Sequence, residues 1–240
     1  MTRPHARPEA RPDAPPLILP DARPHAALRP RRMARGAVLA GALLAASCAP
    51  RAIALAGESA SPARIPVARL APGTHQVTFT WSYRDPDMFA SGEGAVRIAA
   101  PDSARIDLFL RGGMGSGFAI VLGDSIFTPG GAMIARFLPP VSMFWAALGR
   151  LAVPPGDTTV RVDGAITRAD IGYAADVLRV AFERDRLASI ERIAGGSVIE
   201  RVGRGVTEIR YEHYTARRSL ALTITRTQPA GPFDAAIWSR

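Results

Sequence analysis

The histidines and the cysteine are the residues of this chain that could bind a metal, but their spacing does not form a site. Two of the four histidines, His75 and His213, follow residue 48 and are far apart in the sequence. Zinc sites are built from several cysteine and histidine ligands at short spacings. The chain has one cysteine, so neither such a cluster nor an internal disulfide is expected. The sequence therefore predicts no metal and no cofactor.

A serine between two glycines, Gly115-Ser116-Gly117, is the nearest approach to a nucleophile motif. Serine hydrolases of the α/β type need a G-x-S-x-G sequence on a turn from a strand into a helix. Only a fragment of that sequence is present, and strands are expected on both sides of it. We interpret Ser116 as a loop residue. A periplasmic hydrolase is an alternative that would require Ser116, Asp124 and His213 to lie together.

Two further patterns could belong to an enzyme. Asp85 and Asp87 flank a proline, which is typical of a turn rather than of a pair of acid and base. The glycine-rich run 112–117 is only loosely similar to a dinucleotide-binding loop. It precedes an expected strand, so no helix N-terminus is available for a phosphate. No catalytic arrangement is left, and the sequence predicts a binding protein rather than an enzyme.

The single cysteine, Cys48, has the clearest chemistry. It follows an apolar run from Ala37 to Ala46, and Arg31, Arg32 and Arg35 precede that run. A basic start, a short apolar core and small residues at the end are the parts of a secretion signal. The apolar run has about ten residues, whereas a transmembrane helix needs roughly 20. The segment is therefore expected to direct export and not to span a membrane.

The sequence Leu44-Ala45-Ala46-Ser47-Cys48 resembles the lipobox of bacterial lipoproteins. The resemblance implies cleavage before Cys48 and attachment of acyl chains such as palmitate to it. Two or more acyl chains give a stable membrane anchor, where one chain binds only marginally. Ala45 stands where the lipobox usually has leucine. An ordinary signal peptide followed by an accidental cysteine is the alternative.

The charge of the chain does not indicate a nucleic-acid partner. All 30 basic residues are Arg, and the formal net charge is +9. Eight Arg and three acidic residues precede Cys48, which leaves a net charge of +4 for the remainder. A nucleic-acid-binding domain carries a dense basic patch. The abundance of Arg, Ala, Pro and Gly is instead typical of a GC-rich coding sequence.

Composition divides the chain into four segments. Residues 1–32, rich in Pro and Arg, are expected to be disordered; a start codon placed too early or a cytosolic arm are the alternatives. Residues 33–47 form the signal peptide. Residues 48–74 are expected to be a flexible tether, with a short helix or lead-in at 65–70. Residues 75–240 are long enough for one domain with a sizeable core.

From His75 onward the apolar residues recur with a period of two, which predicts half-buried strands. In the first strand Val77, Phe79, Trp81 and Tyr83 alternate with polar residues. The strands expected by this criterion are 75–83, 94–99, 105–110, 118–122, 124–128, 159–166, 177–183, 187–193, 198–202, 206–214 and 220–226.

One stretch, 138–151, has the pattern of a helix instead. Ser142 is its expected N-cap, and Gly149 or the prolines after it would end the helix. The stretch is apolar almost all round, so it should be buried. Many short strands and one helix predict an α+β domain with a strongly curved antiparallel sheet.

The order of several stretches resembles the LolB-like and LolA-like outer-membrane lipoproteins. The lipobox comes first, and the segment 108–117 is similar to a strand–loop–strand in which Met114 falls on a protruding leucine. The segment 138–157 resembles a Pro-led helix that ends before a Pro-Gly-Asp turn, and 211–214 resembles a strand with paired tyrosines. The likeness spans roughly residues 70–228 at low identity.

The resemblance implies an unclosed β-barrel, or half-barrel, that is covered by one or two helices and holds acyl chains. The apolar side chains expected to line its cavity are Phe79, Trp81, Tyr83, Leu108, Leu110, Phe144, Trp145 and Leu148. The alternative is that these residues only pack the core. Met114 would be an exposed tip that contacts a membrane or cargo, unless it folds back on the sheet.

The implied function is that of an outer-membrane lipoprotein, facing the periplasm, in lipoprotein localisation or lipid transfer. Ala49 after the cysteine, rather than Asp, favours the outer membrane. The expected partners are acyl chains or lipoproteins, the membrane through the lipid anchor, and a periplasmic carrier protein, with the chain itself a monomer. The alternative is a structural envelope lipoprotein that docks a protein partner without a ligand pocket.

Overall fold

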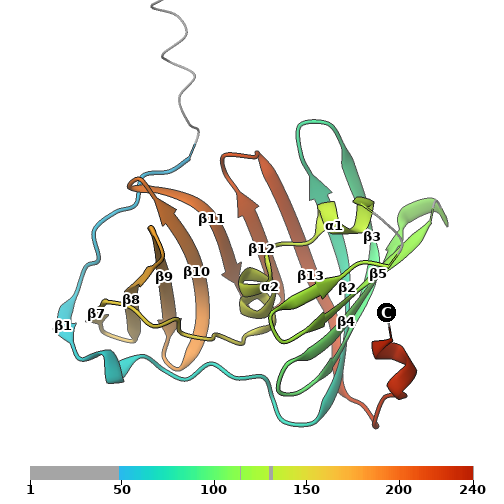
Figure 1. Cartoon of the computed structure of the whole chain (residues 1–240), viewed down its shortest axis with the longest axis horizontal. Helices are drawn as coiled ribbons and strands as arrows, with labels where there is room; N and C mark the ends of the chain where they lie inside the picture. The colour runs from blue at the N-terminus through green and yellow to red at the C-terminus, as the bar shows by residue number, and fades with distance from the viewer. Residues whose placement is uncertain (1–48, 114, 130–131, 240) are drawn as a thin grey trace, which may run out of the picture. The chain divides into compact units, whose positions relative to one another are not determined.

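One antiparallel sheet dominates the computed structural model, which describes residues 49–239 except 114, 130 and 131 (Figure 1). The sheet has 13 strands in the described residues, in the spatial order β1-β7-β8-β9-β10-β11-β12-β13-β2-β3-β4-β5-β6. Because β1 and β6 each pair with one neighbour, the sheet does not close. The strands are β1 (Glu58–Ala60), β2 (Thr74–Arg84), β3 (Phe89–Ala99), β4 (Ser103–Leu110), β5 (Ser116–Leu122), β6 (Ser125–Phe127), β7 (Thr158–Asp163), β8 (Ile166–Tyr173), β9 (Asp176–Glu183), β10 (Arg186–Ala194), β11 (Ser197–Arg204), β12 (Glu208–His213) and β13 (Arg218–Pro229).

The alternation seen in the sequence is also seen in the burial of side chains. In β2, Phe79, Trp81 and Tyr83 are buried, while Thr80 between them is exposed. Successive side chains of a strand point to opposite faces, so this pattern places one face of the sheet in the core. The large, unclosed antiparallel sheet expected from the sequence is therefore confirmed.

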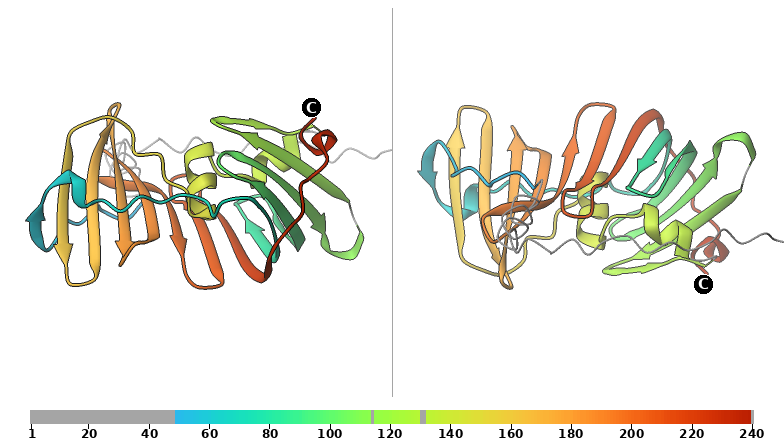
Figure 2. Two further views of the ribbon diagram at one scale, coloured as in Figure 1. Left: turned by 90° about the horizontal axis from the view of Figure 1, so that it is seen from below. Right: turned by 90° about the horizontal axis from the view of Figure 1, so that it is seen from above.

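Two glycines of β3 leave room for aromatic rings of the neighbouring strand. Gly94 pairs with Phe79 of β2, and Gly92 pairs with Trp81. A Cβ atom at Gly94 would lie 2.6 Å from the Cε2 and Cζ atoms of the Phe79 ring, which no real side chain tolerates. Aromatic rings therefore occupy the space above the glycines. Figure 2 shows the twist of the sheet, with the strands around β7–β9 and those around β3–β5 running in different directions.

The helix expected within 138–151 is α2 (Val141–Leu148), which is shorter than that stretch, and another short helix, α1 (Ala132–Phe137), precedes it. Pro140 has no backbone N–H and occupies the N-cap of α2, so Ser142 is not the N-cap. The predicted end at Gly149 is confirmed by its left-handed backbone, at φ 94°. Helix α2 packs against β10, β11 and β12, and α1 packs against β5.

Two expectations for local structure are refined by the structure. The strand expected over 159–166 is β7, which ends at Asp163; after a tight turn at Gly164 a further strand that was not expected, β8, begins at Ile166. Of the short helix or lead-in expected at 65–70, the described structure has the lead-in, an irregular stretch preceded by a 3-10 turn, Pro62–Arg64.

The stretch expected to be a flexible tether is partly attached to the sheet. Strand β1 pairs with β7, and the N–H of Val198 donates to the carbonyl of Pro50 at 2.8 Å. Arg179 Nη1 donates to the carbonyl of Ile53 at 2.6 Å. Residues 50–60 thus lie along the strands rather than free of them. Cys48 lies outside the described residues.

Candidate ligand-binding cavity

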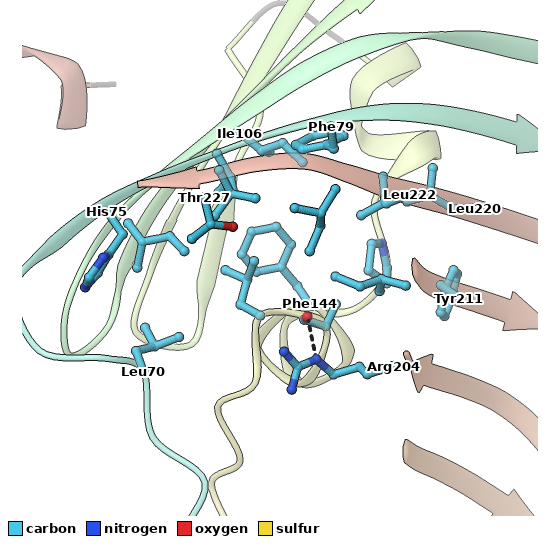
Figure 3. Close-up of a pocket in the computed structure, with 18 of the residues that line it drawn as sticks. Leu70, His75, Phe79, Ile106, Phe144, Arg204, Tyr211, Leu220, Leu222 and Thr227 are labelled. Carbon is cyan, nitrogen blue, oxygen red and sulfur yellow. Dashed lines mark hydrogen bonds between the residues drawn. The ribbon is translucent and has the colours of Figure 1, made fainter. Parts of the chain in front are cut away.

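A cavity of about 240 Å³ lies between α2 and the strands β2, β3, β12 and β13 (Figure 3). Apolar side chains make up most of its wall, and it falls just below the range of about 300–1,000 Å³ typical of small-molecule pockets. Its apolar wall includes Phe79, Phe144, Leu148, Leu220, Leu222 and Ile224.

Strand β13 supplies one long wall of the cavity. Leu220, Leu222 and Ile224 all line it, because side chains two residues apart share a face. The register with β2 shifts between Ile224 and Arg226, which is a β-bulge. After this bulge the inward position falls on Thr227, and Arg226 is exposed. The bulge therefore extends the wall without placing an arginine inside it.

Of the eight side chains expected to line the cavity, the structure brings three to it: Phe79 from β2 and Phe144 and Leu148 from α2. The ring of Phe144 also makes an edge contact with the ring of Trp145, at a centroid distance of 5.6 Å. Trp145 itself points away from the cavity and donates its indole N–H to the carbonyl of Gly123 at 2.7 Å.

The other expected residues pack in the core beyond the cavity. The rings of Trp81 and Tyr83 contact Phe137 of α1, at centroid distances of 5.4 and 4.8 Å. Leu108 is buried, and Leu110 is partly buried against the same core. These four residues share one face of the sheet with Phe79, but Phe137 of α1 packs on the rings of Trp81 and Tyr83.

Arg204 is a cavity residue that the sequence did not suggest. Its Nε donates to the carbonyl of Ala147 at 3.0 Å, and its Nη1 donates to the carbonyl of Leu187 at 3.2 Å. A Cβ at Gly149 would lie within 3.1 Å of three guanidinium atoms, so the guanidinium rests against this glycine. Burial lowers the pKa of Arg204, and the nearby charge of Arg186 lowers it further. The only sequence signal for Arg204 as a cavity residue was the alternation along β11, which places this arginine on the same face as the buried Val202.

A second cavity, of about 360 Å³, shares Leu138, Pro139 and Tyr211 with the first. Its wall is more polar and includes His213 and Arg218. Tyr211 therefore stands between an apolar and a polar space.

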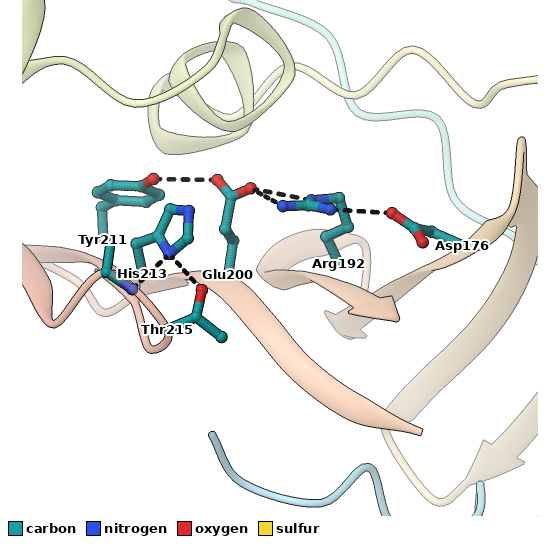
Figure 4. A network of polar contacts seen from close by, with 7 residues as sticks. Asp176, Arg192, Glu200, Tyr211, His213 and Thr215 are labelled. Carbon is teal, nitrogen blue, oxygen red and sulfur yellow. Dashed lines mark hydrogen bonds and ion pairs between the residues drawn. The ribbon is translucent and has the colours of Figure 1, made fainter. Parts of the chain in front are cut away.

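A buried chain of polar contacts fixes Tyr211 in that position (Figure 4). Its hydroxyl donates to Glu200 Oε2 at 3.0 Å, and Arg192 Nε donates to Glu200 Oε1 at 2.9 Å. Arg192 Nη1 in turn donates to Asp176 Oδ2 at 2.9 Å. Burial and the charge of Glu200 both raise the pKa of Tyr211. The charged groups in this chain are paired with one another, so its role is to hold β9, β10, β11 and β12 in place.

The turn at Asp85, expected from the sequence, also anchors α1. The hydroxyl of Tyr83 and Nε of Arg136 each donate to Asp85 Oδ2 at 2.6 Å, and Arg136 Nη2 donates to Asp87 at 2.7 Å. Burial opposes ionisation of Asp85, but the hydrogen bonds from Tyr83, Arg136 and the backbone outweigh it and hold its pKa below the ordinary value.

The residues of the hydrolase alternative do not form a site. Ser116 begins the seven-residue strand β5 and Asp124 follows its other end, about 23 Å away for a strand of that length. His213 lies on β12 and forms hydrogen bonds with Thr215 and Ala216.

In the described part of the chain no three His, Cys, Asp or Glu side chains gather as metal ligands, and no helix there has the length and apolarity to cross a membrane. Met114 lies outside the described residues.

No protein-family model and no curated protein matches the sequence. Solved structures with a similar arrangement include the LolA superfamily protein NE2245 from Nitrosomonas europaea, at 11% identity and a TM-score of 0.47 over 72% of this chain and 92% of that one. A domain from Vibrio parahaemolyticus, assigned as a putative outer membrane lipoprotein-sorting protein, has 8% identity and a TM-score of 0.45 over 69% of this chain and 89% of that one. A chain of the MucA/MucB complex of Pseudomonas aeruginosa has 11% identity and a TM-score of 0.29 over 69% of this chain and 56% of that one.

The first two matches are proteins of the kind that the sequence resembles. The likeness concerns the fold alone, since each TM-score is below 0.5 and each identity is near 10%. The inferences below rest on the cavity and on the chain's own residues.

Proposed function

We propose that this chain is a lipid-anchored protein of the bacterial envelope that binds an acyl chain of a lipoprotein or lipid in the cavity under α2. In this proposal it acts in lipoprotein localisation or lipid transfer at the outer membrane. The sheet is the half-barrel that holds the chain, and α1 and α2 cover it. The observation that carries the proposal is the apolar cavity between α2 and β13.

The size of the cavity supports a ligand rather than a packing defect. Protein interiors are close-packed and rarely contain voids larger than a water molecule. The pocket of about 240 Å³ is partly open, and its wall is mostly apolar. An alkyl chain bound there would remove this apolar surface from water.

The remaining parts of the proposal come from the sequence. Acylation of Cys48 anchors the domain to the membrane, and Ala49 after it favours the outer membrane. Met114 is the tip that touches the membrane or the cargo. The substitution Met114→Glu should then impair transfer of cargo more than folding, and normal transfer at normal abundance would remove this role.

The test is to fill the cavity. In the full chain with Cys48→Ser, we expect Leu222→Trp to abolish binding of the fluorescent apolar probe N-phenylnaphthylamine, because Leu222 lines the cavity. The matched control is Thr223→Trp, which adds the same ring on the exposed face of β13. Native mass spectrometry of the parent protein should also reveal a co-purifying acyl compound. A protein that binds neither probe nor lipid would instead favour the docking lipoprotein without a ligand.

A further inference from the structure

Arg204 is the one charged side chain in the wall of the apolar cavity as the described residues define it. No carboxylate in those residues pairs with it, although several arginines on this sheet, such as Arg179 and Arg192, have carboxylate partners. A half-buried charge without a carboxylate partner is unfavourable in an otherwise apolar wall, so its presence needs an explanation.

The C-terminal end of α2 provides part of that explanation. The carbonyl of Ala147 accepts from Nε, and Gly149 next to it leaves room for the guanidinium. Carbonyls at a helix C-terminus carry partial negative charge and stabilise a cation there. This arrangement fixes the orientation of the Arg204 side chain but does not neutralise its charge.

The guanidinium retains free donors. It has five N–H groups, and its two hydrogen bonds within the described residues use Nε and one N–H of Nη1. Nη2 therefore has no protein acceptor among these residues. Every fully buried side-chain nitrogen or oxygen there has a partner, so Nη2 must be accessible to the cavity or to solvent. A guanidinium with adjacent free N–H groups is suited to bind a carboxylate or phosphate.

Within the described residues, the charged side chain lies at one end of the cavity. Figure 3 shows Arg204 and Tyr211 on one side, and Leu70 and His75 on the other. Phe79 and the leucines of β13 line the space between them. At about 240 Å³ the cavity suits one alkyl chain better than the several chains of a lipoprotein anchor.

We propose that Arg204 binds the anionic headgroup of a single-chain amphiphile, whose alkyl chain fills the cavity toward Leu70. The ligand class is a fatty acid or another single alkyl chain with a terminal anion. This inference rests on the proposed function, since it requires that the cavity take up an alkyl chain. It adds a headgroup site and selectivity for charge.

The test compares headgroups on one chain length. Dodecanoate, dodecyl phosphate, dodecan-1-ol and dodecylamine compete with N-phenylnaphthylamine for the full chain carrying Cys48→Ser. We expect at least one of the two anions to bind about tenfold or more tightly than the alcohol, and the amine to bind most weakly. The tighter anion identifies a carboxylate or a phosphate headgroup. These measurements need no substitution at Arg204, so they hold even if a variant fails to fold.

Substitution then locates the selectivity. Arg204→Gln should remove the preference for the anion and leave the affinity for dodecan-1-ol within about twofold. Arg210→Gln is the matched control, because it removes the same charge from the exposed face of β12 and should keep the preference.

The outcomes separate the two proposals. Equal affinities of the parent protein for anion and alcohol would overturn the headgroup site and leave the acyl-binding function standing. Binding of none of the four compounds would overturn the proposed function itself. Retention of the anion preference by a folded Arg204→Gln variant would show that another residue binds the headgroup.

Discussion

The ring of Phe79 lies directly over Gly94 of the neighbouring strand, where a Cβ atom would be 2.6 Å from two ring carbons. The absence of a side chain at Gly94 thus determines where Phe79 sits. Since Phe79 also lines the apolar cavity, this glycine sets the position of one wall.

Replacement of Gly94 by alanine should therefore narrow the cavity. The new methyl group would push the Phe79 ring toward the cavity and would also crowd the carbonyl of Asp107, at 2.9 Å. We expect severalfold weaker binding of N-phenylnaphthylamine and a loss of about 1–3 kcal/mol in unfolding free energy. Gly203→Ala is the control, because nothing lies within 4 Å of a Cβ there. Unchanged probe affinity for Gly94→Ala would mean that Phe79 does not shape the binding space.

Most strands could be predicted from the sequence because alternation is a local property. Strand β8 could not, since Arg168 and Asp170 give its stretch a polar composition. The structure shows why the strand tolerates them: Asp170 pairs with Arg179 of β9 at 2.7 Å, while Ala169 and Ile171 are buried on the other face. A salt bridge between strands is a tertiary contact that no window of sequence reveals.

The cavity wall could be predicted only in part, for a similar reason. Phe79, Trp81 and Tyr83 are equivalent by alternation, but Phe137 of α1 packs on the last two and not on the first. Which of these aromatic residues faces an open space depends on where the helices dock. The position of Arg204 likewise depends on the C-terminus of α2, which the sequence places far away along the chain.

The substitution Asp85→Asn should lower the melting temperature at pH 7. It should also make the melting temperature fall less steeply as the pH is lowered. The carboxylate accepts from Tyr83, Arg136 and the backbone, and these contacts hold its folded pKa below the value of about 4 for an unfolded chain. Its contribution to stability is complete above that unfolded value and is lost as the pH falls toward the folded pKa. The difference in melting temperature between the parent and the variant should therefore begin to narrow as the pH falls below about 4 and should continue to narrow toward the folded pKa.

Asp87→Asn is the comparison for this experiment. Asp87 contacts the same Arg136, but its side chain is 77% exposed, and exposed ion pairs contribute little. An equal loss of stability in both variants, or a gap between the parent and Asp85→Asn that persists in acid, would argue against the role given to Asp85.

Tyr211→Phe should destabilise the protein by about 1.5–3 kcal/mol, the range for a hydrogen bond to a charged group. The hydroxyl of Tyr211 donates to Glu200, which is 3% exposed and would lose a hydrogen-bond donor that water cannot easily replace. Tyr214→Phe provides the control, because its hydroxyl donates to Glu212 near the surface and should cost under about 1 kcal/mol. Urea unfolding of both variants measures the difference, and equal costs would contradict the importance of the buried chain of contacts.

Cys48→Ser should release the protein from the membrane fraction. The thiol of Cys48 is the group that the lipobox resemblance identifies for acylation, and no other cysteine can replace it. Cells labelled with palmitate should therefore show label in the parent and none in the variant, and the variant should leave the membrane fraction, because the acyl chains are the proposed anchor. Ala49→Ser, next to the cysteine, is the control and should keep the label. Label in the Cys48→Ser variant, or label in neither protein, would contradict acylation of Cys48 and would favour an ordinary signal peptide. Neither outcome would bear on ligand binding in the cavity.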